Sequence, residues 1–183
     1  MSRSYKFHNP DGIYFISFAV VDWLDVFTRR IYKDVLVDGL KYCQENKGLI
    51  LFSWCIMTNH IHLIAKAEPG TSLSAILRDF KKYTARVIIK AISENPTESR
   101  KEILLKSFRE AGIKNSNNSR YQFWRQDNRP IELWSNEVMD QKMNYIHNNP
   151  VEAGFVDHPE DYSYSSAKFI AEKQGELKVE PLY

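Results

Sequence analysis

Residues 49–65 decide how the chain is organised, and they read Leu-Ile-Leu-Phe-Ser-Trp-Cys-Ile-Met-Thr-Asn-His-Ile-His-Leu-Ile-Ala. One apolar run enters a polar corner and a second leaves it, which predicts two strands joined by a tight turn. Side chains two residues apart on a strand point to the same side, so His60 and His62 project together while Ile61 enters the core. Two imidazoles on one sheet face form half of a divalent-metal site. The alternative is an exposed or aromatic-packed histidine pair.

The length and composition fit one globular domain over residues 1–183, because 43% of the residues are hydrophobic and 26% are charged. Cys43 and Cys55 fit no metal or redox spacing, and we expect Cys55, in the apolar run, to be a reduced core residue. The amino terminus lacks the apolar region of a signal peptide, and no apolar stretch approaches a membrane span. We therefore expect a cytoplasmic protein.

The elements around the histidine pair define the expected fold class. An alternating apolar strand at residues 12–21 precedes a helix that ends at Gly48, and Thr71 or Ser72 begins a second long helix after the strand pair. This order resembles the first part of a ferredoxin-like sandwich. We therefore expect an α+β fold with an antiparallel sheet, helices on one face and a further C-terminal helix.

Two segments are expected to be less firmly packed than the rest. Residues 95–119 are polar and basic and predict a flexible insertion, with a short helix around Leu104 and Phe108 and a mobile loop. Residues 170–183 are polar and acidic and predict a loosely held tail.

The last predicted helix carries a tyrosine away from its apolar side. Ser135 can cap this helix, and Pro150 should end it at Asn149 because proline disfavours helical geometry in the preceding residue. The apolar stripe that should face the sheet consists of Met139, Met143 and Ile146. Tyr145 lies about 130° from the centre of that stripe, with Asn149 one turn beyond it. The alternative is an ordinary surface tyrosine.

Positive charge is concentrated in the middle of the chain. The whole chain has a net charge of +2, whereas residues 78–125 hold 12 basic and 5 acidic residues, a net of +7. This block is a candidate surface for a polyanion, although a solvated helix face also gathers such residues. The candidate binding residues are Arg78, Lys81, Lys82, Arg86, Arg120 and Arg125. We also expect Trp124 to be partly exposed and to stack on a base, a core position being the alternative.

In combination these motifs resemble those of the single-tyrosine HUH transposases. His60-Ile61-His62 resembles the HUH motif, and the segment from Asn144 to Gly154 looks like the catalytic helix of that family. The resemblance is closest to the REP-associated tyrosine transposases of the IS200-like branch. Similar segments are Met57 to Leu63, Phe123 to Gln126 and Tyr164 to Ser166.

The resemblance implies metal-dependent cleavage and rejoining of single-stranded, often hairpin-bearing, DNA. Tyr145 would attack the scissile phosphate, form a covalent 5′-phosphotyrosine and release a 3′-OH. His60, His62 and Asn149 would hold Mg²⁺ or Mn²⁺; the family implies either, and the softness of these ligands suits Mn²⁺ better. The candidate binding residues above would contact the DNA.

Other readings remain open at the level of sequence. A nucleic-acid-binding module without catalysis could keep the same fold, and a zinc hydrolase is disfavoured because no Asp or Glu joins the two histidines in a motif. The DNA recognised and whether the element is mobile or domesticated stay open. So does the choice between a monomer and a homodimer, with Tyr145 acting in its own subunit or in the other.

Overall fold

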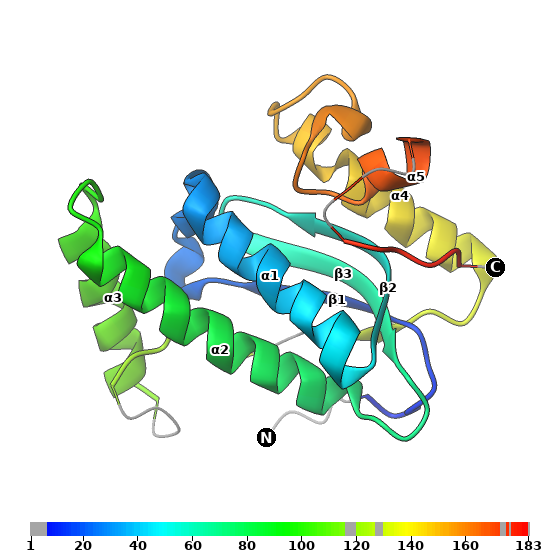
Figure 1. The fold of residues 1–183 in the computed structure, drawn as a ribbon, viewed down its shortest axis with the longest axis horizontal. Coiled ribbons are helices and arrows are strands. Elements are labelled where there is room, and N and C mark those ends of the chain that lie inside the picture. Colours follow the sequence, from blue (N-terminus) through cyan, green and yellow to red (C-terminus); the bar gives the residue numbers. More distant parts are fainter. Residues whose placement is uncertain (1–6, 116–119, 127–129, 173–174, 176, 183) are drawn as a thin grey trace.

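The computed structural model describes residues 7–115, 120–126, 130–172, 175 and 177–182. Its centre is a four-stranded sheet in the order β2-β3-β1-β4, with every neighbouring pair antiparallel (Figure 1). The strands are β1 Tyr14–Ala19, β2 Leu49–Ile56, β3 His60–Ala67 and β4 Ile131–Glu132. This is the strand order of a ferredoxin-like α+β fold, so the expected fold class is confirmed.

Helices cover both faces of this sheet. They are α1 Arg30–Lys47, α2 Leu73–Glu94, α3 Lys101–Ile113, α4 Asn136–Glu152 and α5 Ala167–Glu172, with short 3-10 turns η1 Val21–Trp23, η2 Val26–Thr28 and η3 Pro159–Asp161. The helices α1 and α2 lie side by side on one face, and α4 packs on the other through a second apolar cluster (Figure 1). Among the described residues, no helix is long and apolar enough to cross a membrane.

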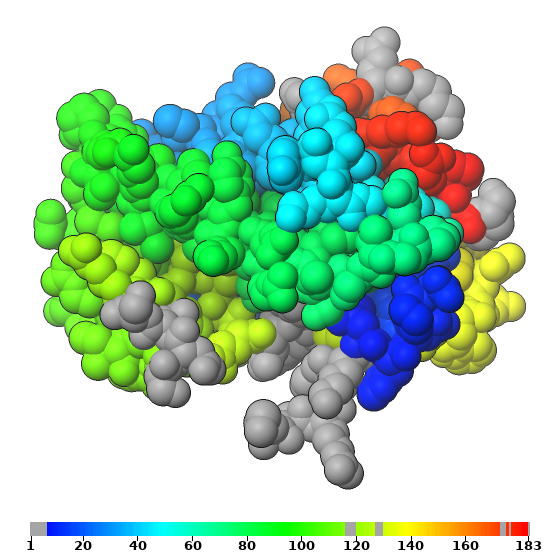
Figure 2. All heavy atoms as spheres, turned by 60° about the horizontal axis from the view of Figure 1, so that its bottom comes forward, coloured from blue at the N-terminus to red at the C-terminus, as the bar shows by residue number. Residues whose placement is uncertain are grey.

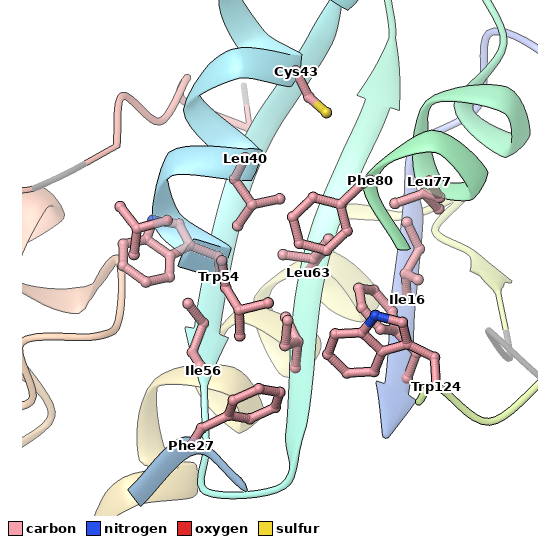
Figure 3. Close-up of a cluster of buried hydrophobic side chains, with 14 of the residues drawn as sticks. Ile16, Phe27, Leu40, Cys43, Trp54, Ile56, Leu63, Leu77, Phe80 and Trp124 are labelled. Atoms are coloured by element: carbon pink, nitrogen blue, oxygen red, sulfur yellow. The ribbon is translucent and has the colours of Figure 1, made fainter. Parts of the chain in front are cut away.

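The face covered by α1 and α2 holds the larger core. Figure 3 shows Leu40, Leu63 and Phe80 meeting between the two helices and the sheet. Gly39 allows the close approach of the helices, since a Cβ there would lie 3.0 Å from the Phe80 ring. Cys43 and Cys55 are both buried free thiols, as expected for Cys55.

Three predicted helix boundaries are confirmed by capping contacts. Ser72 and Ser135 each accept a hydrogen bond from the backbone of the first turn, at 3.4 Å in both cases. Gly48 ends α1 with a φ of 73°, a left-handed conformation that costs glycine little, and its N–H donates to the Cys43 carbonyl.

The predicted end of the last helix at Asn149 is wrong, because α4 continues through Pro150 to Glu152. Proline removes one helical hydrogen bond here, but it lies in the last turn, where few such bonds remain to be lost. Pro150 is also buried, and the Ala153 N–H donates to the Asn149 carbonyl at 3.0 Å. Burial of Pro150 and this hydrogen bond therefore offset the preference of proline for ending a helix.

Both segments expected to be loosely held are packed in part. The short helix expected within residues 95–119 is α3, whose Leu104 and Phe108 are buried, so a flexible insertion does not describe the whole range. Leu177 and Val179 of the expected tail are also buried against the main core. Residues 116–119 of the predicted insertion lie outside the described residues.

Candidate functional site

The side of β3 that faces α4 carries the histidine pair. In the sheet register His60 lies opposite Ala19 of β1, and His62 lies between Ser17 of β1 and Cys55 of β2. The two imidazole rings have centroids 4.7 Å apart. The alternation of β3 therefore places both rings together on one side, as the sequence predicts.

His62 is buried without a hydrogen-bond partner. Its side chain is 4% exposed, and among the described residues neither ring nitrogen has a partner. Burial, followed by the charges of His60 and Lys142, lowers the pKa of His62 to about 3, so the ring is neutral near pH 7. A neutral imidazole has a lone pair that can bind a metal ion, and such a ligand would explain the unpaired nitrogen.

One other buried nitrogen in the described part of the chain also lacks a partner. It is Trp54 Nε1, in the core on the opposite face. An indole nitrogen is only a hydrogen-bond donor and offers no lone pair to a metal. The two orphaned groups therefore differ in what they can bind.

A hydrogen-bond chain orients His60. The amide nitrogen of Asn59 donates to Asp25 Oδ1 at 2.9 Å, and the amide oxygen lies 2.7 Å from His60 Nδ1. The oxygen can only accept, so Nδ1 carries the proton and Nε2 keeps its lone pair. Asn149 of α4 also lies beside His60 and partly opposes the lowering of the His60 pKa by burial.

Tyr145 lies over the same site from α4. Its ring centroid is 5.2 Å from that of His62 and 6.0 Å from that of Phe15, and the side chain is 42% exposed. The ring is therefore held on one side and open to solvent on the other. His60, His62, Tyr145 and Asn149 thus come together as the sequence expectation requires.

Lys142 belongs to the same site and was not expected there. Its Nζ lies 5.0 Å from the Phe15 ring centroid and 5.8 Å from that of Tyr145. The spacing of three residues on one helix puts Lys142 and Tyr145 on neighbouring positions, which is a signal that the sequence did contain. Lys142 adds a positive charge beside the tyrosine.

A partly buried polar contact helps to fix the position of α4. His147 Nε2 lies 3.1 Å from Ser53 Oγ of β2 and 2.9 Å from Ser166 Oγ. Burial lowers the pKa of His147 to about 4, so this ring is also neutral near pH 7. Tyr164 and Ser166 in turn exchange backbone hydrogen bonds with the outer side of β2. This contact holds the helix that carries Tyr145 in place over the sheet.

The donor set at this site fits a divalent cation. Within the described ranges, no cluster of three or more His, Cys, Asp or Glu could hold a metal ion. A metal here would instead be held by two imidazole nitrogens and the Asn149 amide oxygen, a set suited to a divalent cation with open coordination positions. The unpaired nitrogens of His62 are the observation that favours this fit.

The predicted basic residues mostly line one groove between α1, α2 and the segment 120–126. We call it the basic groove, and it encloses about 1360 Å³. Its basic lining beyond α1 consists of Lys81, Lys82, Arg86, Lys90, Arg120 and Arg125. Lys81 also donates to the Arg125 carbonyl at 2.8 Å. Arg78 does not line the groove and forms a salt bridge with Asp79. Figure 2 shows the face of the molecule that α2 crosses.

The prediction that Trp124 is partly exposed and stacks on a base is wrong. Its side chain is 5% exposed, and its Nε1 donates to Thr84 Oγ1 at 3.2 Å. Figure 3 shows the indole on the core side of the sheet, near Phe80 and Ile16. A bridge between Trp124 and Val20 attaches this segment to the end of β1, and the ring is buried as a result.

Comparison with solved structures finds a similar fold over the whole chain. The structure of a REP-associated tyrosine transposase bound to a REP hairpin matches with a TM-score of 0.67 and 14% identity, covering 100% of this chain and 94% of that chain. A putative transposase from Deinococcus radiodurans matches with a TM-score of 0.41 and 18% identity, covering 81% and 95%.

The family follows from the sequence comparison. The family described as Transposase IS200 like matches residues 18–149, a range that contains both histidines, Tyr145 and Asn149. The chain belongs to this family of IS200-like transposases. Comparison with curated proteins gives no match.

Proposed function

We propose that the protein is a metal-dependent transposase that cleaves and rejoins single-stranded DNA through a covalent 5′-phosphotyrosine at Tyr145. The observation that carries this proposal is the position of His62. Its unpaired nitrogens lie beneath a half-exposed tyrosine, with ring centroids 5.2 Å apart. A tyrosine and a ligand-ready histidine on one solvent-accessible site are what phosphoryl transfer needs.

The histidine pair and Asn149 would hold the divalent cation. When bound, Mg²⁺ or Mn²⁺ would polarise the scissile phosphate and neutralise charge on its oxygens. The contribution of the protein is to keep both imidazoles neutral and oriented. Burial keeps His62 unprotonated, and Asn59 fixes which nitrogen of His60 has the lone pair.

The covalent step exchanges one phosphoester for another. Tyr145 Oη attacks the phosphorus, the bond from phosphorus to the 3′ oxygen of the DNA breaks, and the phenol proton is balanced by the proton that the released 3′-OH gains. Attack by a 3′-OH on the phosphotyrosine reverses these bonds and rejoins a strand. Lys142 places positive charge near the tyrosine, where negative charge develops.

The proposed DNA partner is supported by the basic groove and by the fold neighbour that was solved with a REP hairpin. Phosphate contacts from the groove would position a hairpin, because Lys and Arg bind the backbone without regard to sequence. The single-stranded part of the substrate would then reach the histidine pair.

The test is covalent capture of labelled single-stranded hairpin DNA taken from beside the gene of this protein, with Mn²⁺ present. We expect a denaturation-resistant adduct with the unaltered chain and none with Tyr145→Phe, a change that removes one oxygen and little packing. The control is Tyr83→Phe on α2, a tyrosine that is also about half exposed. An adduct that persists in Tyr145→Phe would assign the nucleophile to another residue.

Metal binding is tested separately by titration calorimetry with Mn²⁺. We expect binding by the unaltered chain, none by His62→Ala, and unchanged binding by the control His8→Ala near the amino terminus. Absence of both Mn²⁺ binding and the DNA adduct in the unaltered chain would favour the alternative, a nucleic-acid-binding domain that retains the fold.

A further inference from the structure

An exposed tryptophan contacts His60 of the histidine pair, whereas Tyr145 contacts His62. Trp23 is 51% exposed, and its ring centroid is 5.9 Å from that of His60. It belongs to η1, which follows β1 directly, so the end of the strand sets its place. A large apolar ring at the solvent-exposed edge of the candidate site offers a surface that a ligand can cover.

The backbone that carries Trp23 is strained. Asp22 and Trp23 have φ values of 54° and 53°, and within the described residues these are the non-glycine positions in the left-handed region. A bulky side chain rarely adopts this conformation. Strain of this kind persists where neighbouring contacts enforce it, and it is concentrated at functional sites.

Long-range contacts enforce this conformation. The Asn59 amide donates to the Trp23 carbonyl at 3.2 Å, and the Val21 N–H donates to the Phe123 carbonyl at 2.9 Å. Asn59 also orients His60, so one side chain positions both the tryptophan and the histidine. Trp23 is thereby held at a fixed place relative to the proposed metal ligands.

A cation connects Trp23 to the basic groove. The Arg125 guanidinium lies 5.2 Å from the Trp23 ring centroid, a cation–π contact, and Arg125 also lines the groove. The indole therefore stands between the groove that would hold phosphates and the site that would cut one. A base that follows the backbone out of the groove would meet this ring.

We propose that Trp23 stacks on one base of the single-stranded DNA next to the scissile phosphate. This inference rests on the proposed function and adds to it the residue that positions the strand at the site. Stacking on an indole tolerates every base, because each base has a π face. Trp23 would therefore fix the spacing between the bound strand and Tyr145 rather than the base sequence.

The test measures binding by fluorescence anisotropy, with Tyr145→Phe in every variant so that no cleavage occurs. The probe is a labelled DNA hairpin with an oligo(dT) single-stranded extension. Trp23→Ala should weaken binding by roughly 5- to 100-fold, and Trp23→Phe should retain most of the affinity. The matched control is Trp134→Ala, because Trp134 is 81% exposed and precedes α4.

A series of abasic substitutions along the extension separates stacking from a structural role. One abasic position should weaken binding to the unaltered Trp23, and that position should make no further difference in Trp23→Ala. Stacking would be overturned if Trp23→Ala and its parent bind the probe equally, or if the abasic position weakens binding by Trp23→Ala as well. The role of Tyr145 would then still be tested by covalent capture. No binding of the probe by the Tyr145→Phe parent would overturn both proposals.

Discussion

The first half of β3 carries apolar side chains on one side and two histidines on the other. Ile61 and Leu63 face α1 and α2 and are completely buried among apolar side chains. His60 and His62 face α4, and His62 is nearly as buried but has no partner for its ring nitrogens. Equal burial therefore has two meanings in this sheet. Burial of Ile61 and Leu63 stabilises the fold, whereas burial of the unpaired His62 nitrogens costs stability, which fits the proposed metal site.

The sharpest test of this contrast truncates two neighbouring residues of β3. Leu63→Ala should lower the free energy of unfolding by about 2–5 kcal/mol, because it leaves a cavity in a packed core. His62→Ala should cost about 1 kcal/mol or less without metal, because removing an unpaired buried imidazole offsets much of the lost packing. Urea unfolding in the presence of a chelator measures both.

Equal losses in the two variants would contradict the comparison. They would mean that His62 contributes packing like any core residue and that its burial needs no ligand to explain it. Added Mn²⁺ provides a second test, since it should raise the free energy of unfolding of Leu63→Ala and leave that of His62→Ala unchanged.

Glu98 provides a contrast to His62, because it is a buried charged group whose carboxylate has hydrogen-bond partners. Its carboxylate accepts hydrogen bonds from Arg29 Nε at 2.9 Å, Arg100 Nε at 3.2 Å and the Tyr32 hydroxyl at 3.1 Å. Burial alone would raise the Glu98 pKa, but the hydrogen bonds and charge of Arg100, with the Tyr32 bond, bring it below its ordinary value of 4.5. The folded state therefore favours the ionised form.

Glu98→Gln should lower the free energy of unfolding by about 2 kcal/mol near neutral pH. A lowered pKa stabilises the fold above pH 4.5, and that stabilisation is lost as the pH falls through the folded-state pKa. The difference between Glu98→Gln and the unaltered chain should therefore shrink below pH 4.5. A difference that stays constant through the acid range would show that the charge of Glu98 is not stabilising.

The smallest expected effect concerns the basic groove. Lys82→Ala combined with Arg86→Ala should reduce the slope of log K against log salt for DNA binding by about 2, one for each lost phosphate contact. The control combines Lys106→Ala with Lys168→Ala, which removes equal charge from residues that do not line the groove. If both double variants show the same slope of log K against log salt, the basic groove makes no phosphate contacts beyond those of any solvated charged surface.

The sequence predicted those features that depend on local periodicity. The alternation of β3 placed His60 and His62 on one side, and Ser72, Ser135 and Gly48 marked helix ends by chemistry that acts within one turn. The offset of Tyr145 from the apolar stripe of α4 also follows from helical geometry. These inferences needed no knowledge of which segments meet.

The error at Trp124 arose where distant segments meet. Trp124 is buried because Thr84, forty positions earlier, accepts its hydrogen bond and the end of β1 pairs with it. Trp23 is exposed beside the site because Asn59 holds it in a conformation that local preferences disfavour. No prediction concerned Trp23, and neither environment was encoded in the residues next to the tryptophan.

The C-terminal segment pairs with β2, the strand at one edge of the sheet. The Ile56 N–H donates to the Tyr164 carbonyl at 2.9 Å, the Ser166 N–H to that of Trp54 at 2.9 Å, and the Glu180 N–H to that of Leu51 at 2.8 Å. These bonds occupy backbone groups that an edge strand would otherwise offer to a second sheet. The C-terminal segment thus protects the β2 edge of the sheet against edge-to-edge aggregation.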